Sequence, residues 1–316
     1  MKNELNKILN STISVAEKAA IACYDWIGKG HSDLADQAAV TAMRSELNEL
    51  NINGTIVIGE GERDKAPMLY IGEKVGKGGL EVDIALDPLE GTTLCAHAKS
   101  NSYAVIAFSS KNSFLHAPDV YMDKIAVGPN LPKGVIDLDN SVEQNLKNLA
   151  KAKNKAVSDL VITILERKRH QELITKCRES GAKIRLIQDG DIAAIIEVNQ
   201  MKCDNAPDIY IGTGGAPEGV LAAASMKSTG GQMMARLIFN DNYKQVDRAK
   251  KMGITDINKK YDQDSLVKDD AIFIASAVTD GDLLGVRKYH NSIFVNSIVM
   301  NSSQKMIRTI KTQYKL

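Results

Sequence analysis

This sequence has few cysteines, no long apolar run and no excess of charge of either sign. The four cysteines, Cys23, Cys95, Cys177 and Cys203, are far apart and form no CxxC or Cys/His cluster. This spacing excludes a zinc knuckle and a disulfide framework, and it favours a reducing cytoplasm. No apolar run approaches the roughly 20 residues that a membrane-spanning helix needs. The N-terminal stretch has helical spacing and lacks the form of a signal peptide, so we expect a soluble cytoplasmic protein.

The charge balance excludes two classes of partner. Lys and Arg number 40 and Asp and Glu number 39 in a chain of 316 residues. This near cancellation leaves no overall basic field that would draw the protein onto nucleic acid or a membrane. The five histidines are scattered, so the sequence indicates neither a serine-type triad nor a histidine metal site. Partner choice must therefore come from local sites.

Helical and strand-like patterns alternate along the chain, which predicts an α/β fold. We expect helices over 3–27, 34–50, 141–156, 170–180 and 191–199, and strands over 55–58, 81–86, 103–108, 160–165, 183–187, 208–211 and 292–300, followed by a short basic tail. A soft boundary near residue 155 divides the chain into an N-terminal α/β half, 1–155, and a C-terminal α/β half, 156–316. We expect the two halves to form one compact body.

The segment Asp87-Pro88-Leu89-Glu90-Gly91-Thr92-Thr93 carries the clearest chemical signal. Pro88 restricts the residue before it to an extended conformation, so Asp87 should end its strand. Gly91 allows a sharp turn, and Thr92 or Thr93 is suited to cap a following helix. The result is a bend with two carboxylates and a hydroxyl, which are ligands that Mg²⁺ or Mn²⁺ prefers.

Two further acidic loops strengthen the metal interpretation over the alternative that these acids merely mark turns. One is the loop 59–64, which contains Glu60 and follows a strand; the other is the glycine-rich segment 212–219, which contains Glu218. A dinucleotide-binding loop is rejected for the second, because Pro217 stands where its third glycine would be needed. Gathered carboxylates repel one another unless cations neutralise them. The sequence therefore predicts a carboxylate metal site.

Basic and acidic residues near the middle of the chain have two interpretations each. Arg167, Lys168, Arg169 and His170 follow a predicted strand and could bind a phosphate, or they could form an ordinary exposed charged face. The segment Asp189-Gly190-Asp191 could bind sugar hydroxyls or cap the next helix. Spacing alone favours the ordinary interpretation in both cases.

The acidic motif resembles the signature of the lithium-sensitive, metal-dependent phosphatases, which include inositol monophosphatases and fructose-1,6-bisphosphatases. Further segments are similar, in order, to class II fructose-1,6-bisphosphatase: IVIGEGERDKAPMLYIGEKVG at 56–76, APDVYM at 117–122, TILERKRH at 163–170, QDGD at 188–191 and GTGGAPEG at 212–219. This resemblance covers essentially the whole chain. It implies a stacked α-β-α-β-α sandwich and a homo-oligomer, either a dimer or a tetramer.

The resemblance also implies roles for particular residues. The implied ligands of the divalent metal, Mn²⁺ or Mg²⁺, are Asp36, Glu60, Asp87, Glu90 and Glu218. The implied catalytic residues are Thr92, Glu60 and Glu90. The implied substrate contacts are Glu90, Gly91, Thr92, Tyr121, Arg167, Lys168, Arg169, Asp189, Gly190, Asp191 and Gly215. Two positions depart from the family pattern: Ser32 stands in a segment where a lysine is common, and Arg167 stands where a lysine is familiar.

The activity that the resemblance implies is hydrolysis of the 1-phosphate of fructose 1,6-bisphosphate to give fructose 6-phosphate, a step of gluconeogenesis. The alternative within the superfamily is a phosphatase for sedoheptulose 1,7-bisphosphate, an inositol phosphate or a phosphonucleotide. A basic stretch after residue 165 favours a substrate with two phosphates. An inactive metabolite-binding protein is a third possibility, but it would have little use for a costly carboxylate cluster.

Overall fold

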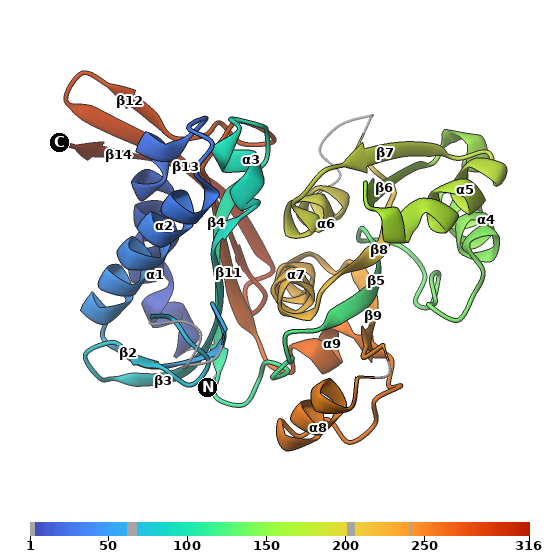
Figure 1. The fold of residues 1–316 in the computed structure, drawn as a ribbon, viewed down its shortest axis with the longest axis horizontal. Coiled ribbons are helices and arrows are strands. Elements are labelled where there is room, and N and C mark those ends of the chain that lie inside the picture. Colours follow the sequence, from blue (N-terminus) through green and yellow to red (C-terminus); the bar gives the residue numbers. More distant parts are fainter. Residues whose placement is uncertain (1–3, 62–67, 201–205, 241) are drawn as a thin grey trace. The chain divides into compact units, whose positions relative to one another are not determined.

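The chain folds into two units, each with its own sheet (Figure 1). The computed structural model describes residues 4–61, 68–200, 206–240 and 242–316, so Cys203 and the end of the acidic loop 59–64 lie outside the described residues. Unit 1 comprises Met1–Leu115 and Val267–Leu316, and unit 2 comprises His116–Leu266. The predicted α/β class is confirmed, because both units combine a sheet with helices. The boundary expected near residue 155 falls inside unit 2.

Unit 1 is built on an eight-stranded sheet. Its order is β12-β13-β11-β4-β3-β1-β2, with β14 paired to β13. The strands are β1 (Ile52–Ile58), β2 (Lys74–Val75), β3 (Leu80–Glu90), β4 (Tyr103–Ser110), β11 (Ala271–Ala277), β12 (Arg287–Tyr289), β13 (Ser292–Asn301) and β14 (Met306–Lys315). The C-terminal strands thus complete a sheet that the first hundred residues begin.

Two long helices cover this sheet. They are α1 (Leu5–Ala22) and α2 (Ser32–Glu49), which lie side by side in Figure 1. The short η1 (Tyr24–Trp26) lies between them in the sequence, and the short helix α3 (Thr92–Ala96) follows β3. Apolar residues of α1 recur at helical spacing and pack with those of β3, β4, β11 and β13 in one buried core. The segment expected to be a basic tail is instead β14. Its half-buried Ile310, Thr312 and Tyr314 alternate with exposed basic and polar residues, as in a strand with one covered face.

Unit 2 contains a six-stranded sheet of order β10-β9-β5-β8-β6-β7. Its strands are β5 (Tyr121–Val127), β6 (Val161–Leu165), β7 (Lys183–Ile187), β8 (Ile209–Gly215), β9 (Gln232–Ile238) and β10 (Tyr261–Asp262). Its helices are α4 (Val142–Lys153), η2 (Val157–Asp159), η3 (Lys168–His170), α5 (Gln171–Glu179), α6 (Asp191–Gln200), α7 (Ala216–Thr229), α8 (Tyr243–Lys251) and α9 (Gln263–Leu266). β6 is parallel to β7 and β8, whereas β5 is antiparallel to β8 and β9.

Helices cover both faces of the unit 2 sheet. Successive side chains of a strand point to opposite sides of the sheet, so β5 contacts helices on both faces. Ile125 and Val127 of β5 join an apolar cluster with α4 and α5. Met122 and Lys124 of the same strand face Gly219 of α7 on the other side. A lysine therefore points into the α7 side of the sheet. Along the described segments, no helix has the length and apolar character that crossing a membrane requires.

Candidate functional site

The acidic motif lies along the end of β3 in unit 1. This strand runs to Glu90, so the prediction that Asp87 would end it was wrong. Pro88 is tolerated because the pairing of β3 with β1 ends at Ala85, and the register with β4 shifts between Asp87 and Glu90. The Oδ1 of Asp87 accepts a hydrogen bond from the backbone of Leu89 at 3.1 Å, and Glu90 is buried. A bulge thus sets the positions of both acids.

Gly91 makes the turn from β3 into α3. It has a φ of 74°, in the left-handed region, and a Cβ at this position would lie 2.8 Å from Cδ1 of Leu94. Gly91 itself precedes the helix without a side-chain cap, so the prediction that Thr92 or Thr93 caps it was wrong. Thr92 is the first residue of α3 and is half-buried, whereas Thr93 is exposed. The hydroxyl of Thr92 therefore has no capping role.

Two acids of unit 1 act electrostatically on a third, Glu60. Asp36 comes from α2, Glu60 follows β1 and Asp87 lies on β3. Burial, and then the negative charges of Asp36 and Asp87, raise the pKa of the Glu60 carboxyl to about 8. Burial and the charge of Asp33 also raise the pKa of Asp36. The arrangement penalises the ionised carboxylates, as expected where a cation normally balances them.

The same acids are not drawn together into a closed chelate. Within the described ranges, no group of three or more His, Cys, Asp or Glu residues could hold a metal ion. The effect of Asp36 and Asp87 on Glu60 is nevertheless electrostatic, and Coulomb interactions act over longer distances than bonds to a metal. An all-oxygen donor set of this kind fits Mg²⁺ or Mn²⁺, which are commonly held by a few carboxylates together with substrate oxygens.

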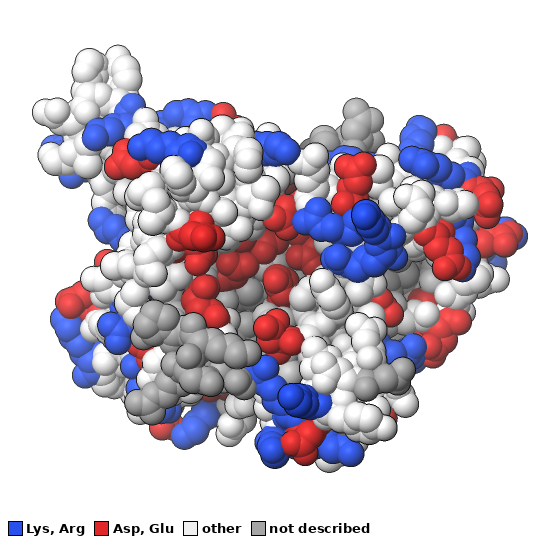
Figure 2. All heavy atoms as spheres, viewed as in Figure 1, with Lys and Arg blue, Asp and Glu red and all other residues white. Residues whose placement is uncertain are grey.

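The predicted substrate contacts of unit 2 lie near the end of β6. Figure 2 shows a cluster of basic side chains on the visible face of unit 2, between the places that β6 and β8 occupy in Figure 1. Arg167 lies 3.7 Å from Asp189 as an ion pair. The guanidinium of Arg169 stacks 4.8 Å from the ring centre of Tyr121, and its Nε donates to the carbonyl of Thr213 at 2.9 Å. Arg167 thus lies beside Asp189, and Arg169 lies beside Tyr121 and the backbone of β8.

A buried histidine, which the sequence had placed among the candidate phosphate ligands, holds this basic segment in place. His170 Nδ1 lies 2.7 Å from the carbonyl of Leu165, and the backbone N–H of Thr213 donates to Nε2 at 2.8 Å. A carbonyl can only accept, so Nδ1 carries the hydrogen and the imidazole is neutral. Desolvation lowers the pKa of His170, although its contact with the carbonyl of Leu165 opposes this shift. Its place in a charge run gave no sign of burial.

The segment 189–191 begins α6. Gly190 has a φ of 86°, and its N–H donates to Oδ1 of Asp189 at 3.1 Å. Burial raises the pKa of Asp189, while Gly190 and Arg167 oppose this shift. Asp191 is buried and forms an ion pair with Lys124, which also donates to the carbonyl of Gly215 at 2.9 Å. Sequence reasoning did not single out Lys124. Its place between the apolar residues Met122 and Ala126 on one face of β5 was the signal that it is buried.

Gly215 and Glu218 lie at the turn from β8 into α7. Gly215 precedes the helix, Pro217 stands in its first turn, and Glu218 lies in that turn as well. A Cβ on Gly215 would overlap the carboxylate of Glu218, and one on Gly214 would overlap that of Asp191. Both glycines are therefore required by close packing around carboxylates.

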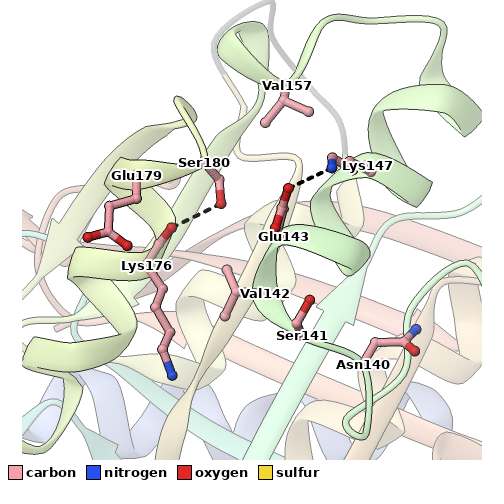
Figure 3. A pocket seen from close by; sticks show the side chains of 9 residues that line it. All are labelled: Asn140, Ser141, Val142, Glu143, Lys147, Val157, Lys176, Glu179 and Ser180. Atoms are coloured by element: carbon pink, nitrogen blue, oxygen red, sulfur yellow. Dashed lines mark hydrogen bonds and ion pairs between the residues drawn. The ribbon is translucent and has the colours of Figure 1, made fainter.

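One cavity lies away from all of these residues. It has a volume of about 640 Å³ and is formed in unit 2 by α4, α5 and their surroundings (Figure 3). Its lining residues are Asn140, Ser141, Val142, Glu143, Lys147, Val157, Lys176, Glu179 and Ser180. None is a predicted site residue, and Glu143 and Lys147 already pair with each other at 2.6 Å.

A carboxylate destabilised by neighbouring acids and an anchored group of basic side chains are the features of a metal-dependent enzyme for phosphorylated substrates. The comparisons with known proteins agree with this class and make it more specific. The family described as bacterial fructose-1,6-bisphosphatase, glpX-encoded, matches residues 6–314. The chain belongs to this family, the class II fructose-1,6-bisphosphatases, so the resemblance drawn from its motifs is confirmed.

Individual relatives match over almost their full length. A class 2 fructose-1,6-bisphosphatase of Haemophilus influenzae is 42% identical over 96% of this chain and 94% of the relative. Fructose-1,6-bisphosphatase 1 class 2 of Escherichia coli K12 is 43% identical over 96% of this chain and 93% of the relative. A Synechococcus protein named D-fructose 1,6-bisphosphatase class 2/sedoheptulose 1,7-bisphosphatase is 40% identical over 97% and 95%, respectively.

Proposed function

We propose that this protein hydrolyses the 1-phosphate of fructose 1,6-bisphosphate, releasing fructose 6-phosphate and inorganic phosphate. The observation that carries this proposal is that the charges of Asp36 and Asp87 help to raise the pKa of Glu60, in a chain that matches the class II family from residue 6 to residue 314. Membership of a gluconeogenic enzyme family also supports a cytoplasmic location.

Metal binding is assigned to the carboxylates. Asp36, Glu60, Asp87 and Glu90 of unit 1 and Glu218 of unit 2 would hold Mn²⁺ or Mg²⁺. The bound cations would activate the attacking water and stabilise charge on the phosphoryl oxygens and the leaving alkoxide. The raised pKa of Glu60 supports this assignment, because a nearby cation would favour its ionised form.

The remaining steps belong to side chains of the protein. Thr92, which begins α3 and caps nothing, would orient the water and accept or relay its proton, while Gly91 lets the backbone approach the phosphate closely. Arg167, Lys168 and Arg169 would bind the distal 6-phosphate, with Tyr121 as the surface against which Arg169 stacks. Asp189, Gly190 and Gly215 would contact the sugar.

Sedoheptulose 1,7-bisphosphate is the second substrate to test, because the printed name of the Synechococcus relative includes it. Inositol phosphates and phosphonucleotides fit less well, because a monophosphate needs no second basic anchor.

A substrate panel tests the proposal. Phosphate release is measured with both bisphosphates, fructose 6-phosphate, an inositol phosphate and a phosphonucleotide, each with Mn²⁺, Mg²⁺ or EDTA. We expect fructose 1,6-bisphosphate to give the highest kcat/KM with a metal and no turnover in EDTA. A preference for a monophosphate, or full activity in EDTA, would contradict the proposal. The expected homo-oligomer stays a prediction, which analytical ultracentrifugation would check.

A further inference from the structure

Lys124 is a buried charge at the centre of unit 2. Its side chain has no exposed surface, and that of its partner Asp191 is 8% exposed. Transferring a lysine and a carboxylate out of water costs several kcal/mol per ion, and their attraction repays this cost only with good geometry and further hydrogen bonds. The second hydrogen bond of Lys124, to the carbonyl of Gly215 at 2.9 Å, supplies such a contact.

The contacts of Lys124 join three segments of the fold. Lys124 belongs to β5, Asp191 is the first residue of α6, and Gly215 is the last residue of β8 before α7. β5 and β8 are paired directly, with Lys124 opposite Gly212. One ammonium group therefore ties the start of α6 to the turn that carries Gly215 and Glu218.

Small residues around Lys124 leave room for this arrangement. A Cβ on Gly214 would lie 2.9 Å from the Nζ of Lys124, and a Cβ on Gly219 would lie 3.4 Å from its Cδ. Because real Cβ atoms essentially never come within 3.0 Å of another heavy atom, Gly214 cannot be replaced without moving the ion pair. The β8–α7 turn is thus shaped around the lysine.

We propose that Lys124 is a positioning residue that fixes the turn between β8 and α7 through Asp191 and the carbonyl of Gly215. Lys124 does not touch the substrate on this proposal. It holds Gly215 and Glu218 in the orientation that binding of the sugar bisphosphate requires. Asp191 then acts as the partner of Lys124, not as a reader of sugar hydroxyls. The inference rests on the proposed function, because that function assigns Gly215 and Glu218 to the site.

A double-mutant cycle tests this role. The variants are Lys124→Met, Asp191→Asn and the two together, each assayed at a temperature where circular dichroism shows a folded protein. Residues that act as one unit give non-additive effects. We expect each single variant to raise KM for fructose 1,6-bisphosphate about tenfold or more, and the double variant to stay within about twofold of the worse single variant.

A second buried pair provides the matched control. Asp208 immediately precedes β8, at the opposite end from Gly215, and it pairs with Lys153, whose side chain is 12% exposed. Lys153→Met combined with Lys155→Met, which removes both lysines that pair with Asp208, should lower the melting temperature as Lys124→Met does but leave KM within about twofold of the wild type. If both lysine variants raise KM equally, Lys124 has a general structural role and the positioning proposal is overturned.

Two further measurements distinguish a variant that does not fold from a failure of the proposed function. If Lys124→Met alone does not fold, the double variant, which leaves no uncompensated buried charge, should fold and still show the raised KM. Calorimetry with fructose 1,6-bisphosphate in EDTA measures binding without turnover. A wild type that binds but never hydrolyses this ester would contradict the proposed function and leave the cycle measurable as Kd. Any of three results would overturn the positioning role: additive effects of the two substitutions on KM, wild-type affinity in a folded double variant, or no binding by the wild type.

Discussion

The buried carboxylates of the two units differ in where their balancing charge comes from. In unit 2, Asp191 pairs with Lys124, and Asp208 pairs with Lys153 and Lys155. In unit 1, the influences on Glu60 are burial and the like charges of Asp36 and Asp87. Asp191 and Asp208 of unit 2 are therefore neutralised by lysines, whereas Glu60 of unit 1 lies near acids whose charges disfavour its ionised form.

This difference separates structural carboxylates from functional ones. A buried ion pair is costly but complete, so its loss should affect folding first. A group of like charges destabilises the fold and persists where function requires it, so its loss should affect activity first and folding little. The comparison therefore makes opposite predictions for Asp208 and Glu60.

The largest expected effect is on catalysis in unit 1. Thr92→Ala and Glu90→Gln should each lower kcat/KM by about 10²–10³, or about 3–4 kcal/mol of transition-state stabilisation, because each removes a group that acts on the developing charge or on the attacking water. The measurement is phosphate release with saturating metal. Thr93→Ala is the control, since Thr93 is the exposed neighbour in the same helix. Near-normal turnover by Thr92→Ala would remove this threonine from the mechanism.

The next effect is on stability in unit 2. Burial acts to raise the pKa of Asp208, but hydrogen bonds from Lys153, the backbone of Val161 and Lys155 outweigh it and lower the pKa overall. Asp208→Asn should therefore lower the free energy of unfolding by about 3 kcal/mol, with the lysines left uncompensated. Urea unfolding measures this change.

The control for Asp208 is an acid of the same unit in an exposed ion pair. The side chain of Asp247 is 65% exposed and pairs at 2.7 Å with that of Lys251, which is 76% exposed. Asp247→Asn should cost less than about 0.5 kcal/mol. Equal losses in the two variants would mean that burial does not govern the value of these pairs.

Local patterns predicted the elements of this fold better than their assembly. The helix periodicity over 34–50 and the apolar strand at 55–58 were enough to indicate α2 and β1. Periodicity cannot show which sheet a strand joins, however, so the return of residues 267–316 to unit 1 was not foreseen. β14 was missed because Arg308, Lys311 and Lys315 face outward from an edge strand and resemble a charged tail.

The candidate site was predictable to a similar extent. Acids and glycines at strand ends indicated a metal site, because those residue types have a distinct chemistry in a turn. Lys124 escaped notice, and His170 was taken only for a possible phosphate ligand, because their roles come from burial against distant segments, Asp191 for the lysine and Thr213 for the histidine. Such partners are separated by more than forty residues and have no local sequence pattern.

A smaller effect sharpens the comparison through pH. Desolvation lowers the pKa of His170, so the folded state favours its neutral form; this contribution is present above the unfolded pKa near 6.5 and is lost as pH falls through the lower folded pKa. Protonated Nε2 cannot accept from Thr213, and nearby Arg169 adds repulsion that Asp123 partly offsets. Between pH 7.5 and 5 the wild type should lose about 1–2 kcal/mol more than His170→Gln. His97→Gln, at an exposed histidine, should follow the wild type in the same urea titrations.

The smallest effect contrasts most directly with Asp208. Glu60→Gln keeps the side-chain volume and removes a carboxyl whose ionisation is disfavoured by burial and by the charges of Asp36 and Asp87, so in EDTA at neutral pH the free energy of unfolding should rise by about 1 kcal/mol. Mn²⁺ should then stabilise the wild type more than the variant, because a ligand that binds the folded state stabilises it in proportion to its affinity. Thermal melts with and without the ion measure both effects, and Glu81→Gln, at an exposed residue of β3, is the control. A Glu60→Gln protein that is less stable in EDTA would show that this carboxylate is structural, and the distinction between the two units would fail at its central residue.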